Sequence, residues 1–140
     1  FFNWVQAGIA TQDLCQALLV AGSYAHGIPK PSSDIDLLVI SHKPHALYVD
    51  PQWVGEFDAV ESCITEDFGA VVGKRVLYRN GLEVEYGFGH LNWLDLPLDA
   101  GTRRVLSDGV IVLKETQQAS VTEILISQGL HPKTKKESNS

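Results

Sequence analysis

A glycine-serine turn and a pair of aspartates, set between two apolar runs, constrain the fold of this chain more than any other feature. In order they are the apolar residues 17–21, Gly22-Ser23, ten further residues, Asp34 with Asp36, and the apolar residues 37–40. Short apolar runs bounded by turn residues are typical of buried strands. The sequence therefore predicts strands at 17–21 and 35–41 that hold the turn and the two carboxylates close together.

The two aspartates have the spacing of a metal site. On a strand, residues separated by one position point to the same face. Two like charges on one face repel each other unless a cation lies between them, and carboxylate oxygens suit Mg²⁺. The plain alternative is a solvated Asp-x-Asp, but unpaired charges at the start of an apolar run are costly. We therefore expect Asp34 and Asp36 to bind Mg²⁺.

Gly22 and Ser23 have the chemistry of a phosphate-binding turn, because a glycine backbone can approach a phosphate and N–H and hydroxyl groups can donate to it. With the aspartate pair, they resemble the nucleotidyltransferase superfamily with the DNA polymerase beta-like fold. Its small bacterial members include antibiotic nucleotidyltransferases and the minimal nucleotidyltransferases of toxin–antitoxin pairs. The resemblance is close over residues 17–40 and looser to about residue 90. It implies an α/β (α+β) fold, with a mixed sheet of about five strands flanked by helices.

One position departs from the family pattern. Many relatives carry Arg where this chain has His26. Two interpretations stay open. Either His26 contacts phosphate or orders the turn, less strongly than Arg and in a pH-dependent way, or it is a surface residue without a role.

The fold implies a third acid on a neighbouring strand, and the candidates are Glu83 and Glu85. They follow Asn80-Gly81, the preferred pair for a two-residue β-hairpin turn between 71–79 and 82–88. Such a turn would pair Tyr78 with Glu83 and place Lys74 on the face of both acids, where it could neutralise phosphate. The resemblance slightly favours Glu83 as the metal-binding family acid. Glu85 is the alternative, as metal ligand or general base in its place.

Weaker patterns predict the remaining elements. We expect a helix within residues 3–16, a loop from 42 to 57 with a short helix near 52–57, and an acidic region from 56 to 67. A second hairpin is expected from 104–106 and 110–113, and a helix at 120–128. Arg103 and Arg104 could contact triphosphate, but a solvated pair is the favoured interpretation.

Composition bounds the organisation and the partners. The 140 residues predict one domain at 1–130 and a disordered polar tail at 131–140. The formal net charge of −6 argues against general nucleic-acid binding. No membrane span or secretion signal is visible, and Cys15 and Cys63 follow no metal spacing, so we expect a cytoplasmic protein.

Together these features predict a Mg²⁺-dependent transfer of a nucleoside monophosphate, most simply AMP from ATP, to an acceptor hydroxyl. The acceptor would be a small molecule or a protein, including the toxin of a toxin–antitoxin pair. The alternative is a non-catalytic nucleotide-binding or antitoxin-like module that acts by sequestering a partner.

Overall fold

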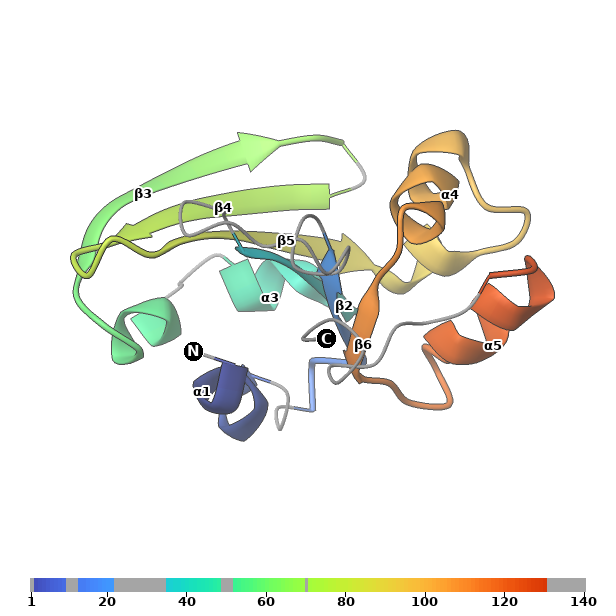
Figure 1. Cartoon of the computed structure of the whole chain (residues 1–140), viewed down its shortest axis with the longest axis horizontal. Helices are drawn as coiled ribbons and strands as arrows, with labels where there is room; N and C mark the ends of the chain where they lie inside the picture. The colour runs from blue at the N-terminus through green and yellow to red at the C-terminus, as the bar shows by residue number, and fades with distance from the viewer. Residues whose placement is uncertain (1, 10–12, 22–34, 49–51, 70, 131–140) are drawn as a thin grey trace.

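A six-stranded mixed sheet forms the centre of the protein (Figure 1). The computed structural model describes residues 2–9, 13–21, 35–48, 52–69 and 71–130. The strands are β1 (Ala17–Ala21), β2 (Ile35–Ser41), β3 (Val60–Asp67), β4 (Val71–Tyr78), β5 (Glu83–His90) and β6 (Ile111–Lys114). Their order across the sheet is β3-β4-β5-β2-β1-β6. The expected mixed sheet is confirmed, with six strands in these described ranges instead of about five.

One parallel strand pair at the centre of the sheet connects two groups of antiparallel strands. β2 and β5 run parallel, whereas β1–β2, β1–β6, β4–β5 and β3–β4 are antiparallel. β1 and β2 match the strands expected at 17–21 and 35–41. Both are buried over most of their length, because apolar side chains on both faces pack against other elements.

Alternation along the strands builds one core on each face of the sheet. The first face carries Val39, Tyr78 and Tyr86, and it is covered by α1 (Phe2–Ala7), α3 (Pro44–Tyr48) and the 3₁₀ turn η2 (Gln52–Glu56). Figure 1 shows α1 and α3 together on this side. The Tyr78 hydroxyl donates to the Val54 carbonyl at 2.8 Å and lies 2.7 Å from the Tyr86 hydroxyl. These bonds satisfy two buried phenols and fix η2 to the sheet.

The second face is covered over only part of its length. Leu38 and Ile40 of β2 pack there with η3 (Leu91–Leu94), α4 (Ala100–Ser107) and α5 (Val121–Ser127). This cover lies towards the end of β2, while Asp36 stands at its beginning. The polar start of β2 and its neighbours on β4 and β5 therefore remain accessible beside the helices.

Several local expectations from sequence were wrong. Among the described residues of the helix expected within 3–16, only those of α1 are α-helical, and the acidic region from 56 to 67, for which no strand was expected, contains the edge strand β3. The segment expected to begin a second hairpin is α4, whose N-cap Asp99 accepts from the Thr102 backbone N–H at 2.8 Å. A side-chain cap of this kind favours a helix start over a strand. The expected helix at 120–128 is confirmed as α5.

The hairpin of β4 and β5 is confirmed, but its turn is one residue longer than expected. The Tyr78 N–H donates to the Leu82 carbonyl, and the Gly81 N–H donates to the Tyr78 carbonyl. Gly81 has a φ of +93°, whereas Asn80 does not have a positive φ. A two-residue type I′ turn needs positive φ at both central residues, so this is a three-residue turn closed by a left-handed glycine. The register of the two strands shifts accordingly.

None of the helices in the described part of the chain is long and apolar enough to cross a membrane.

Candidate active site

Two carboxylates lie side by side at the centre of the sheet. Asp36 of β2 is the register partner of Glu85 of β5. Partners on adjacent parallel strands point to the same face, so both side chains lie on the second face. Apolar neighbours along each strand pin this register, since a slip of one residue would turn the acids into the core. The arrangement places two like charges on one small surface.

Arg75 of β4 supplies a positive charge beside them. It is the register partner of Glu85 across the antiparallel pair. Its Nε lies 3.2 Å from Glu85 Oε2 and 3.2 Å from Glu66 Oε1, and its Nη1 lies 3.2 Å from Glu83 Oε1. Three acids from β3 and β5 therefore converge on one guanidinium. Its planar set of donors suits several carboxylates at once.

The structure does not place Lys74 with these acids. The longer turn pairs Leu77 with Glu83 and Arg75 with Glu85, so Lys74 points to the opposite face. There its Nζ donates to the Thr65 hydroxyl at 2.6 Å. The expectation that Lys74 shares the acid face was wrong, because it assumed a two-residue turn. Arg75, the next residue, occupies that face.

Glu85 is the most constrained of the acids. Its side chain is 18% exposed, and both carboxylate oxygens are buried without a hydrogen-bond partner among the described residues. Nε of Arg75 is near enough for an ion pair, but the geometry of a hydrogen bond is met only towards Glu66. Burial raises the pKa of Glu85, as do Glu66, Asp36 and Glu83, while Arg75 lowers it. A carboxylate in this setting is stabilised by an additional cation.

Gly73 makes room for this carboxylate. A Cβ at Gly73 would lie 2.5 Å from Glu85 Oε1 and 3.1 Å from Cε2 of Phe68. Any larger residue would displace the Glu85 side chain or the Phe68 ring. The absent side chain thus lets Glu85 lie against the sheet next to Phe68.

The residues present fit a divalent cation of the type expected. Asp36 and Glu85 are hard oxygen donors on one face, and the two buried oxygens of Glu85 accept no hydrogen bond from the described residues. In the described ranges no three acidic, histidine or cysteine side chains are grouped as a metal site. Asp34, which the sequence predicts as a ligand, lies outside the described residues, as do Gly22, Ser23 and His26.

Glu83 lies one pleat before Glu85 on the same face of β5. Its carboxylate faces Arg75. The described part of β2 begins at Ile35, the partner of Val84, so no described residue of β2 is level with Glu83. The preference for Glu83 over Glu85 therefore remains a prediction, while Glu85 is the acid that stands beside Asp36.

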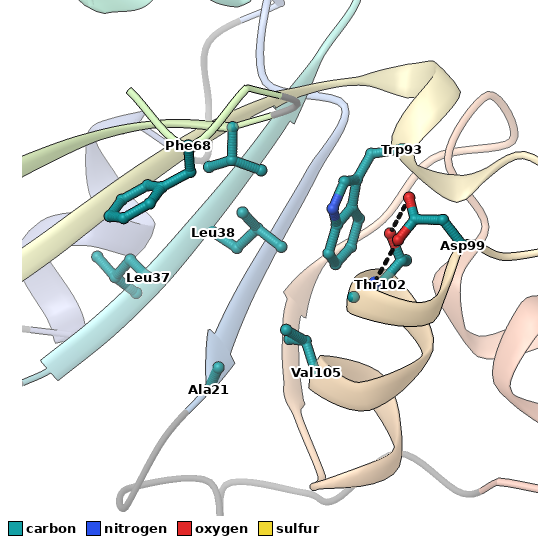
Figure 2. A pocket seen from close by; sticks show the side chains of 10 residues that line it. Ala21, Leu37, Leu38, Phe68, Trp93, Asp99, Thr102 and Val105 are labelled. Carbon is teal, nitrogen blue, oxygen red and sulfur yellow. Dashed lines mark hydrogen bonds between the residues drawn. The ribbon is translucent and has the colours of Figure 1, made fainter. Parts of the chain in front are cut away.

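A pocket of about 390 Å³ lies on the second face of the sheet (Figure 2). It lies between the strands and α4, with Leu38 and Phe68 on one side and Trp93 and Val105 on the other. Ala21, the partner of Asp36 and the residue before Gly22, also lines it. Asp99 and Thr102 at the start of α4 form its polar border. The pocket thus touches both β1 and the acid-bearing face.

Sequence reasoning missed Arg75, Gly73, Phe68 and Trp93. Trp93 is only 8% exposed, yet it forms a wall of the pocket. Lys74 and Arg75 are adjacent on β4 and therefore point to opposite faces of the sheet. The one additional residue in the turn places Arg75, and not Lys74, on the face of the acids. Arg103 and Arg104 are exposed on α4, and Arg103 Nη1 donates to Gln128 Oε1 at 2.7 Å.

Comparison with protein families identifies this arrangement. A family model described as a nucleotidyltransferase domain matches residues 12–88, which are 77 of the 140 residues. The chain belongs to the nucleotidyltransferase domain family. The matched residues run from the segment before β1 to Phe88 within β5, and include the turn, both aspartates and both candidate glutamates. The resemblance seen in the sequence is confirmed at the level of the superfamily.

A solved structure agrees on the fold. The nucleotidyltransferase domain is similar to an aminoglycoside 6-adenyltransferase from Bacillus subtilis, with a TM-score of 0.50 and 9% sequence identity. The similarity covers 66% of this chain and 33% of the other, so this chain spans about one third of its length. At this identity the likeness shows the fold alone. No curated protein sequence matches the chain.

Proposed function

We propose that this domain transfers a nucleoside monophosphate, in the simplest case AMP from ATP, to an acceptor hydroxyl. The observation that carries the proposal is the pairing of Asp36 with Glu85 on one face, inside a nucleotidyltransferase domain. The ion pair with Arg75 leaves both buried oxygens of Glu85 without a hydrogen bond from the described residues, and this supports a role in binding a further group.

In this proposal Asp36, with Asp34, holds Mg²⁺. When bound, this ion draws charge from the phosphates and orients them. Gly22 and Ser23 hold the β- and γ-phosphates. These roles of Asp34, Gly22 and Ser23 come from the sequence pattern, since all three lie outside the described residues.

Glu85 is our proposed general base. It accepts the proton of the acceptor hydroxyl while the hydroxyl oxygen forms a bond to the α-phosphorus, and pyrophosphate leaves with the electrons of the broken P–O bond. Arg75 is a positioning residue, because it holds Glu66, Glu83 and Glu85 through contacts of 3.2 Å. Glu83 remains the alternative base or metal ligand.

The acceptor class is open between a small molecule and a protein, including a toxin partner. A non-catalytic nucleotide-binding or antitoxin-like module is the second candidate. The presence of Asp36 beside a second carboxylate favours an enzymatic function, because sequestration of a partner does not require a metal ligand paired with a general base.

The test is incubation of the purified protein with Mg²⁺ and ATP labelled at the α-phosphate, with candidate acceptors and detection of labelled adducts. We expect EDTA and Asp36→Asn each to abolish transfer, while the circular dichroism of the variant stays that of the wild type. Undiminished turnover by Asp36→Asn at saturating Mg²⁺ would contradict the proposal. Tight binding of Mg–ATP without transfer to any acceptor would favour the non-catalytic module.

A further inference from the structure

The pocket between the sheet and α4 has the size of a small-molecule site. Its volume of about 390 Å³ lies within the range of about 300–1,000 Å³ that is usual for ligand pockets. Its walls come from β1, β2, the β3–β4 connection, β4, η3 and α4, and the lining residues range from Ala21 to Val105. Because several strands and helices contribute to the lining, the pocket depends on the fold as a whole and not on the conformation of a single loop.

The pocket lies close to the proposed base. Phe68 lines the pocket, and Phe68 and Glu85 both lie above Gly73, where a Cβ would be 3.1 Å from Phe68 Cε2 and 2.5 Å from Glu85 Oε1. Leu38, another lining residue, is two positions after Asp36 on the same strand and face. A molecule in the pocket would therefore lie beside the two carboxylates.

The lining selects for an apolar ring. Leu37 borders the pocket, but its side chain belongs to the core of the first face. The other apolar side chains that line the pocket are Ala21, Leu38, Phe68, Val71, Trp93 and Val105. The two polar side chains, Asp99 and Thr102, already bond to each other at 3.0 Å. Phe68 is 62% exposed, so one aromatic face is available to a ligand. Flat rings pack well against such surfaces.

We propose that this pocket binds an apolar ring of the acceptor, carried next to the hydroxyl that is modified. The inference rests on the proposed function. A general base must be within hydrogen-bond reach of the hydroxyl it deprotonates, so the acceptor is the substrate that must lie beside Glu85. The hydroxyl proton passes to Glu85, its oxygen bonds to the α-phosphorus, and pyrophosphate departs.

The experiment uses 4-fluorobenzyl alcohol as the probe, a small ring that carries one hydroxyl, and follows its binding to the full chain by fluorine NMR. Val105→Trp fills the pocket, and Ile126→Trp is the matched control, since Ile126 is 59% exposed on α5 and does not line the pocket. We expect Val105→Trp to weaken probe binding by at least about tenfold. The control should bind the probe like the wild type.

A second variant guards against misfolding of the first. Phe68→Ala removes an exposed ring. We expect this variant to bind the probe several-fold more weakly than the wild type, with an unchanged melting temperature. Saturating Mg²⁺ with α,β-methylene-ATP should leave the probe bound, because donor and acceptor occupy different places. Displacement of the probe by this nucleotide would assign the pocket to the donor and overturn the proposal.

The remaining outcomes are equally decisive. Absence of probe binding to the wild type, or unchanged binding by both pocket variants, would overturn the acceptor pocket but not the nucleotidyl transfer. Failure of the wild type to bind Mg²⁺ with α,β-methylene-ATP would instead overturn the proposed function, and with it the acceptor role of the pocket.

Discussion

Asp36 and Glu85 are direct partners across the parallel strands β2 and β5, and Arg75 of β4 is the partner of Glu85 on its other side. One row across the sheet therefore carries a carboxylate, a second carboxylate and a guanidinium. This row unites the acid pair expected of a metal-dependent transfer with a positive charge that holds it in place.

The two glutamates of β5 are expected to differ in importance. Glu85→Gln should lower the rate of transfer by about 10²–10⁴, the usual contribution of a general base. Glu83→Gln should only impair transfer, because Glu83 lies one pleat from the partner of Asp36. Single-turnover kinetics of both variants measure this. The reverse order would restore Glu83 as the family acid.

Gly73→Ala tests the position of the Glu85 side chain. The new methyl group would overlap Glu85 Oε1, which can move because it is the end of a flexible side chain. We expect a fall of about 10²-fold in kcat, as for a displacement of about 1 Å, with little loss of stability. Gly55→Ala is the control, since its Cβ meets no atom within 4 Å. Equal activity of the two variants would contradict the placement of Glu85.

Arg75→Met should leave three acids without their shared cation. Because the Arg75 side chain is 41% exposed, each ion pair is screened, and we expect a loss of only about 1 kcal/mol in the free energy of unfolding. Activity should fall more than stability, since Glu85 loses its fixed neighbour. Arg75→Lys should restore part of the activity. Arg79→Met, at the exposed turn, is the matched control for the loss of charge.

Gly81→Ala tests the three-residue turn. The φ of +93° at Gly81 is unfavourable for any residue with a Cβ, so the substitution should cost about 1–2 kcal/mol. Urea denaturation measures this cost, with Gly55→Ala as the comparison. A neutral effect would mean that the turn has another conformation and that the register between Arg75 and Glu85 must be revised.

Asp99→Ala should lower thermal stability in a pH-dependent way. Hydrogen bonds from the Thr102 backbone N–H and hydroxyl lower the pKa of Asp99 below its ordinary value of 3.8. A lowered carboxyl pKa contributes stability above the unfolded-state pKa, and that contribution is lost as the pH falls through the folded-state pKa. The difference in melting temperature should therefore be present at pH 7 and shrink below about pH 4. The exposed Asp95→Ala serves as control.

Local patterns in the sequence determined the centre of the fold. The apolar runs at 17–21 and 37–40 are short, buried and bounded by turn residues, and strands follow directly from such patterns. The alternation around Glu83 and Glu85 likewise predicted a strand with both acids on one face. These features depend only on residues that are close in the chain, which is why the superfamily could be recognised.

Only the tertiary structure decided which side chains meet. The turn at Gly81 is one residue longer than the Asn-Gly pair suggests, and this step exchanges Lys74 for Arg75 on the acid face. Asp36 and Glu85, which pair across β2 and β5, are 49 positions apart in the chain, and Ala21 and Val105 both line the same pocket. Local propensity does not encode register between distant strands, because register is set by packing both faces of the sheet at once. The sequence alone therefore indicated the reacting groups, while their neighbours were decided by the fold.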